Sequence, residues 1–92
     1  GREFVFTHQG HLVGESAATL RELAVVVRRV DTEVLAGHCK HHDFSRWVTS
    51  LFCDHDLSKD IRQLELKHTR TASSEGFATE LCEIIERRYE SS

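Results

Sequence analysis

Histidine is the residue type with the most chemical potential in this 92-residue chain, which contains seven of them. His38 and His42 are four residues apart, so one face of a helix would present both imidazoles. His8 and His11 flank Gln9-Gly10, a signal for a tight turn that would place the two side chains opposite each other. Four imidazoles are enough for a tetrahedral Zn²⁺ or Ni²⁺ site. The pattern therefore suggests a metal site at His8, His11, His38 and His42.

The same region has a simpler interpretation. The chain contains neither Cys-x2-Cys nor His-Glu-x2-His, the spacings typical of zinc sites. His41 and His42 would then be solvated, and His38 would be a half-buried helical residue. Cys39 is a conceivable nucleophile, but adjacent helical residues point about 100° apart, so Cys39 and His38 would not face each other. We therefore expect no enzymatic activity, and no cofactor other than a Zn or Ni ion.

A second group of candidate residues lies directly after the histidines. Asp43 could act as a general base, but its position predicts the N-cap of a helix. Arg46 could hold an anion, and Trp47 could line a ligand pocket. Phe44 and Trp47 also begin an apolar stripe at helical spacing, so Trp47 is expected to anchor the core. We predict that Asp43, Phe44, Arg46 and Trp47 form a structural or binding core.

The elements that must position these residues begin with a β-hairpin over about residues 4–14. A two-residue turn at Gln9-Gly10 pairs His8 with His11, Phe6 with Val13 and Phe4 with Glu15. Because side chains alternate along a strand, Phe4 and Phe6 share one face. A lone hairpin is marginally stable in water, so it must pack on helices.

The rest of the chain predicts about five short helices. Thr19 and Glu22 have the spacing of a capping box, and Asp31, Asp43 and Asp56 are candidate caps of the next three helices. Ser73 or Ser74 would start the last helix. The expected ranges are about 20–30, 32–41, 44–52, 57–67 and 75–89. The predicted fold is mainly α with a small N-terminal β-hairpin (α+β), a single domain over residues 1–92 with one core.

Residues 12–65 resemble DUF5752, a family of small prokaryotic domains of unknown function. The resemblance is carried by Gly14-Glu15-Ser16-Ala17, by the segment His38-x4-Asp43-Phe44-Ser45-Arg46-Trp47, and by Ile61-Arg62 and Glu65. It implies a bacterial or archaeal source and a soluble accessory module, and it implies no chemistry. The cluster Cys39, His41 and His42 is not part of the resemblance.

Composition narrows the classes of function. Residues 1–52 carry 6 basic and 6 acidic side chains, whereas residues 53–92 carry 6 and 9, which gives the net charge of −3. Such a balance argues against nucleic acid as a partner. There is no long apolar run for a membrane, and the three widely spaced cysteines are typical of reduced thiols in a cytoplasmic protein.

Two main hypotheses of function remain. The first is a non-enzymatic protein-interaction or regulatory accessory module that binds a protein partner or forms a homo-oligomer. The alternative is a metal- or ligand-binding sensor domain that uses the clustered histidines. A pH-sensing variant of the sensor predicts a transition near about pH 6–7, where imidazoles titrate. An enzyme whose site forms across a homodimer is a third hypothesis, to which no residue points.

Overall fold

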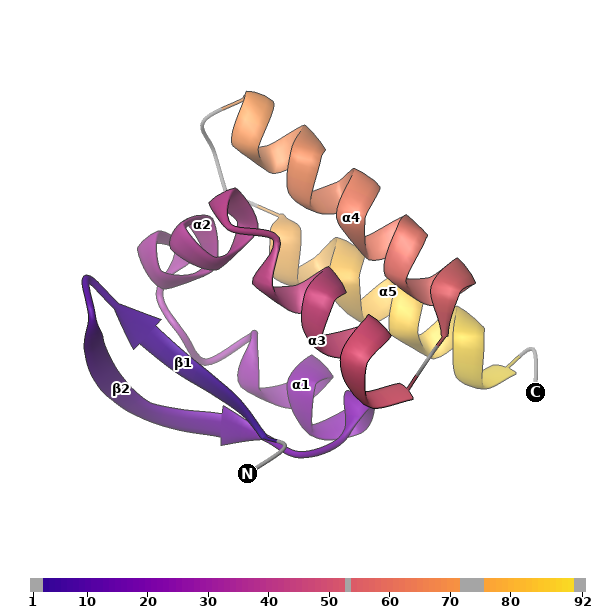
Figure 1. Cartoon of the computed structure of the whole chain (residues 1–92), viewed down its shortest axis with the longest axis horizontal. Helices are drawn as coiled ribbons and strands as arrows, with labels where there is room; N and C mark the ends of the chain where they lie inside the picture. Colours follow the sequence, from indigo (N-terminus) through magenta and orange to yellow (C-terminus); the bar gives the residue numbers. More distant parts are fainter. Residues whose placement is uncertain (1–2, 53, 72–75, 91–92) are drawn as a thin grey trace.

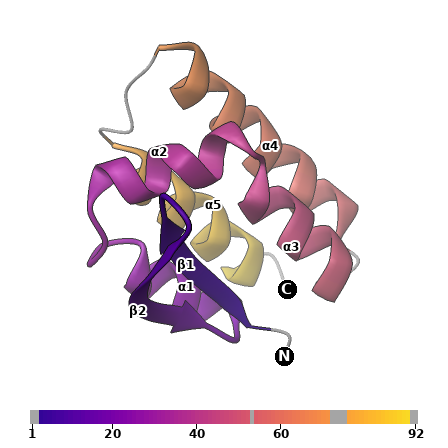
Figure 2. The ribbon, with the colours of Figure 1, turned by 60° about the vertical axis from the view of Figure 1, so that its left-hand side comes forward.

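A computed structural model describes residues 3–52, 54–71 and 76–90 of the chain. Within this part a two-stranded antiparallel hairpin precedes five helices, which confirms the predicted α+β fold class. The elements are β1 (Phe4–His8), β2 (His11–Ala17), α1 (Leu20–Val26), α2 (Thr32–Lys40), α3 (Asp43–Phe52), α4 (His55–Arg70) and α5 (Phe77–Glu90). Figure 1 and Figure 2 both place α2 and α3 between the hairpin and α4, while α5 lies alongside α4.

The turn of the hairpin agrees with the sequence pattern. Gln9 and Gly10 both have positive φ, at +52° and +82°. Two consecutive residues with positive φ give the turn a twist that matches the twist of antiparallel strands. His8 accordingly pairs with His11, as predicted.

The register further along the hairpin differs from the prediction. Phe4 pairs with Ala17 instead of Glu15, and Val5 pairs with Ser16. The shift arises because residues 13–15 of β2 oppose the single residue Phe6 of β1, which also removes the expected Phe6–Val13 pair. Gly14, with φ +85°, supplies the left-handed backbone in this bulge. β2 therefore continues to Ala17, beyond the predicted end near residue 14.

The first helix begins as its capping residues predict and ends early. The Thr19 hydroxyl accepts a hydrogen bond from the Glu22 N–H at 3.1 Å, and the Glu22 carboxylate accepts one from the Ala18 N–H at 2.8 Å. α1 ends at Val26, before the predicted end at residue 30. After the Val27 amide, the Arg28 and Arg29 amides bond to carbonyls three residues back, which tightens the chain into a turn.

The start of α4 is another correction. Asp54, and not Asp56, caps this helix by accepting the Leu57 N–H at 3.1 Å, and α4 extends from His55 to Arg70. Arg88 of α5 donates to the other Asp54 oxygen at 2.7 Å. Burial opposes ionisation of Asp54, but the bonds from Leu57 and Arg88 prevail and lower its pKa.

Asp31 occupies the N-cap position of α2 without a side-chain cap bond. The predicted caps Ser73 and Ser74 lie outside the described residues.

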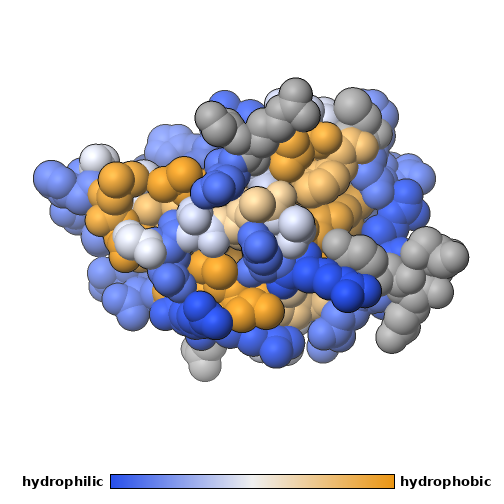
Figure 3. All heavy atoms as spheres, turned by 90° about the horizontal axis from the view of Figure 1, so that it is seen from below, coloured by the Kyte–Doolittle hydropathy of each residue, from blue (hydrophilic) through white to orange (hydrophobic). Residues whose placement is uncertain are grey.

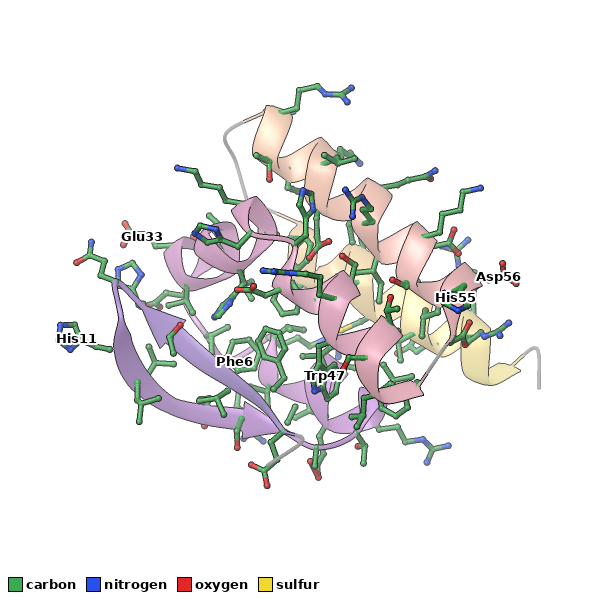
Figure 4. All side chains as sticks on the ribbon, in the orientation of Figure 1. Phe6, His11, Glu33, Trp47, His55 and Asp56 are labelled. Carbon is green, nitrogen blue, oxygen red and sulfur yellow. The ribbon has the colours of Figure 1, made fainter. Side chains whose placement is uncertain are left out.

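Stacked aromatic rings connect the hairpin to the helices. Phe4 of β1 lies parallel to Phe44 of α3 at a centroid distance of 4.8 Å, and Phe44 contacts Phe77 of α5 at 5.3 Å. Phe6 and Phe44 are fully buried. Figure 4 shows Phe6 and Trp47 directed into the space between the hairpin and α3. This column of rings joins the first strand to the last helix.

Trp47 lies at the border of this core. It is half-buried and contacts Phe4 and Phe52 edge to face, at 5.7 and 5.4 Å. The apolar stripe of α3 is thus fully buried at Phe44 and Val48, and it becomes exposed towards Phe52, which is 39% exposed.

We predict opposite effects for two glycine-to-alanine substitutions. A Cβ atom meets nothing within 4 Å at either Gly14 or Gly37, so only the backbone conformation distinguishes the two sites. Gly14→Ala places a side chain in the left-handed region and should destabilise the protein by about 1 kcal/mol. Gly37→Ala, inside α2, should stabilise it by about 1 kcal/mol. Urea denaturation measures both, and equal stability of the two variants would refute the role assigned to Gly14.

Candidate functional site

Three histidines in the described part of the chain form close hydrogen bonds with carboxylates of other segments. His38 Nδ1 lies 2.7 Å from Asp43, His42 Nδ1 lies 3.3 Å from Glu65, and His68 Nε2 lies 2.7 Å from Glu80. The first two pairs lie around the turn between α2 and α3. Because two imidazoles and two carboxylates that are buried or half-buried meet here, this turn is the first candidate for a functional site.

Glu65 is the most buried charged group at this turn, with none of its surface exposed. One carboxylate oxygen accepts the backbone N–H groups of Phe44 and Ser45, at 3.1 and 3.3 Å, and the other faces His42. A carboxylate from α4 therefore caps the N-terminus of α3. Burial raises the pKa of Glu65, and the hydrogen bonds from Ser45 and His42 only partly offset this effect.

This arrangement corrects the predicted cap. Asp43 is the first residue of α3, so it lies inside the helix and not at the N-cap position before it. One Asp43 oxygen faces His38 Nδ1, and the other accepts from Arg46 at 2.8 Å. Arg46 also donates to the His41 carbonyl at 2.7 Å. Asp43 and Arg46 thus close the turn between α2 and α3 from its outer side, above the buried Phe44.

His38 connects this turn to the hairpin. It is buried, and its Nε2 atom accepts a hydrogen bond from the Thr7 N–H at 3.1 Å. Nδ1 is therefore the protonated nitrogen and donates to Asp43. Both ring nitrogens have protein partners, and the Phe4, Phe6 and Phe44 rings surround the imidazole at centroid distances of 5.0, 5.6 and 5.7 Å.

The four histidines of the predicted metal site have different surroundings. His8 is half-exposed, 4.0 Å from Glu33, while His11 is exposed and points away from the molecule in Figure 4. His38 and His42 are held by Asp43 and Glu65, so binding a metal through the bonded nitrogens would break these contacts. Across residues 3–52, 54–71 and 76–90, no group of three or more His, Cys, Asp or Glu side chains is arranged to hold a metal ion.

A small polar cleft lies between the tip of the hairpin and α2. Its volume is about 210 Å³. Its lining residues are Thr7, His8, Gln9, Gly10, Gly37, His38, His41 and Asp43. Three imidazoles thus border one cleft, but the His38 nitrogens are already occupied within the fold.

Cys39 is placed unfavourably for nucleophilic chemistry. It is 1% exposed, and burial, together with the charge of Glu65, raises the pKa of its thiol to about 12. The thiol therefore stays protonated at neutral pH, whereas the thiolate is the reactive form. Cys82 is also buried, and its thiol donates to the Ala24 carbonyl. Cys53 lies outside the described residues.

Glu65, His68 and Glu80 were not among the residues singled out for the site. Glu65 and His68 could have been found from the apolar stripe of α4, because both continue the buried face formed by Leu57, Ile61 and Leu64. A charged or polar residue on a buried stripe requires a partner. His68 finds Glu80, whose pKa is lowered by hydrogen bonds from Lys67 and then from His68. This pair joins α4 to α5.

The outer side of the hairpin and α1 exposes apolar side chains. Leu12 is 75% exposed, Val25 51% and Val5 46%. A groove of about 410 Å³ lies between β2 and α1, with a lining of Ser16, Arg21, Glu22, Val25, Val26 and Arg29. Figure 3, which views the molecule from the side of β2 and α1, shows hydrophobic groups separated by hydrophilic ones. This is the second candidate site, a surface rather than a cleft.

Comparisons with protein-family models, curated proteins and solved structures give no match to this chain. The resemblance to DUF5752 therefore stays a prediction. None of the helices in the described residues is both long and apolar enough to span a membrane.

We predict that Glu65→Ala destabilises the protein by about 3 kcal/mol, because two buried N–H groups lose their acceptor. Glu65→Gln should cost less, since an amide oxygen still accepts these hydrogen bonds. Because the pKa of Glu65 is raised in the fold above its ordinary value of 4.5, protonation favours the folded state. The stability of the natural chain relative to Glu65→Gln should thus increase as the pH falls through the raised pKa.

Chemical denaturation at several pH values measures this difference. Glu83→Gln, at an exposed position of α5, is the matched control and should leave the pH profile of stability unchanged. A stability difference between the natural chain and Glu65→Gln that is constant with pH would show that Glu65 does not carry a raised pKa.

Proposed function

We propose that this chain is a non-enzymatic protein-interaction module, and that its contact surface is the outer face of the hairpin together with the groove between β2 and α1. The observation that carries the proposal is the exposure of Leu12, Val25 and Val5 around a groove. Water-exposed apolar side chains next to a concave surface are typical of protein contact sites.

The arrangement of the hairpin supports the continuity of this surface. Val5 pairs with Ser16, and Thr7 pairs with Leu12, so these four residues share the face opposite to the buried Phe4 and Phe6. Ser16 also lines the groove beside α1. The apolar residues of the hairpin therefore border the groove, and a single partner segment can contact both.

Charge favours an acidic partner. Residues 20–30 carry three arginines and one glutamate, a net charge of +2 in a chain whose net charge is −3. Glu22 is already engaged, because its carboxylate accepts the Ala18 N–H. Arg29 is 63% exposed, and its 3.9 Å contact with Glu15 is too long for a hydrogen bond, although that Glu15 oxygen is itself buried. The surface thus suits a peptide segment that combines apolar side chains with carboxylates.

A peptide display selection tests this proposal directly. Immobilised protein is offered two libraries of apolar peptides, one interspersed with acidic residues and the other with basic residues. We expect the acidic library to be enriched, and the selected peptides to shift the NMR signals of the Leu12, Val25 and Arg29 amides. Arg29→Glu should weaken binding about tenfold, as expected when a favourable charge contact becomes repulsive.

Arg62→Glu, at an exposed arginine of α4, is the matched control and should bind the selected peptides as the natural chain does. Enrichment of basic peptides, or shifts confined to the cleft at the hairpin tip, would contradict the proposed surface. Concentration-dependent dimerisation that is abolished by Leu12→Ser would identify a second copy as the occupant and would also contradict the acidic segment.

A further inference from the structure

We propose that His38 is a pH-sensitive latch that holds the β1 edge of the hairpin against α2 only while its Nε2 atom is unprotonated. This inference concerns the stability of one contact inside the fold. It does not depend on the interaction surface proposed above.

The geometry at Thr7 carries the inference. The Thr7 N–H belongs to β1, which pairs only with β2 among the described residues, and it donates to His38 Nε2 at 3.1 Å. An imidazole nitrogen accepts a hydrogen bond only through its lone pair, which protonation removes. In the imidazolium form, two N–H donors would face each other at this position, inside a buried site. Protonation thus converts an attractive contact into a repulsive one.

The Nδ1 side of the His38 ring keeps its partner when Nε2 is protonated, so only the contact with β1 is lost. Nδ1 donates to Asp43 at 2.7 Å, and this nitrogen carries a proton in the imidazolium as well as in the neutral ring. The contact between α2 and α3 is therefore maintained when His38 gains a proton, whereas the contact with β1 is lost. The surrounding Phe4, Phe6 and Phe44 side chains offer no hydrogen-bond acceptor for the new Nε2–H.

Other charged and titratable groups near the His38 ring come from the elements that pack around it. Arg46 of α3 donates to the Asp43 oxygen that does not face His38. His8 of β1 and His41, directly after α2, line the cleft next to His38. Glu65 of α4 is hydrogen-bonded to His42, and its charge acts on the thiol of Cys39, the residue after His38. None of these groups replaces Nε2 as the acceptor for Thr7.

The test follows one amide and one imidazole in the same ¹⁵N-labelled full chain. Hydrogen exchange gives the protection of the Thr7 amide, corrected for its intrinsic rate, and imidazole ¹⁵N shifts give the protonation state of His38. Between about pH 8 and pH 5, where imidazoles titrate, we expect the protection of Thr7 to fall about tenfold as Nε2 gains its proton. The Leu64 amide in α4 should keep its protection.

Three variants complete the test. His38→Gln places an uncharged acceptor near the position of Nε2, so Thr7 should stay protected at both pH values. His11→Gln, at an exposed histidine of the same hairpin, should behave like the natural chain. Asp43→Asn removes the charge beside Nδ1 but keeps an oxygen that can accept its proton, so Thr7 should still lose its protection as Nε2 gains a proton. This variant keeps the proposal testable if His38→Gln does not fold.

Two results would overturn the latch. The first is protonation of His38 at Nε2 with unchanged protection of Thr7. The second is a His38 ring that stays neutral until the whole protein unfolds in acid, because the contact would then never be switched in the folded state.

Discussion

The rest of the structure depends on how the N-terminus of α3 is satisfied inside the protein. The first turn of a helix has N–H groups without partners in that helix, and here this turn lies against α4 instead of water. A buried carboxylate, Glu65, accepts two of these groups and holds His42 as well. Because burial of this charge is costly, its position relative to Phe44 and Ser45 fixes how α4 packs on α3. The apolar contacts of Phe44 and Val48 then form around a defined arrangement of the two helices.

The two strand edges of the hairpin avoid further strand pairing in different ways. An isolated two-stranded sheet has an unpaired edge on each side, and open edges favour unwanted strand pairing. On β1, His38 binds the Thr7 N–H and so engages that edge with α2. On β2, the bulge around Gly14 interrupts the regular row of backbone groups. The hairpin can therefore expose Leu12 and Val5 on its outer face, while neither of its edges offers a regular row of free backbone groups.

Local patterns predicted local structure well. Gln9-Gly10 indicated the turn and the His8–His11 pair, Thr19 and Glu22 indicated the start of α1, and the stripe from Phe44 indicated the buried face of α3. Contacts between distant residues were not predictable in this way. The candidate cap nearest in sequence, Asp43, is displaced by Glu65, because tertiary packing brings a stronger buried acceptor to the same N–H groups. The two-residue shift in β2 likewise follows from packing and from the freedom of Gly14, and spacing alone did not reveal it.

The column of aromatic rings has a consequence for synthesis of the chain. Phe4 belongs to the first strand, Phe44 to α3 and Phe77 to the last helix, and the three rings lie in contact. A ribosome makes the chain from its N-terminus, so Phe4 and Phe44 emerge well before Phe77 can cover them. During that interval the nascent chain exposes an unfinished aromatic surface of the kind that chaperones bind. The core closes only after α5 has left the exit tunnel.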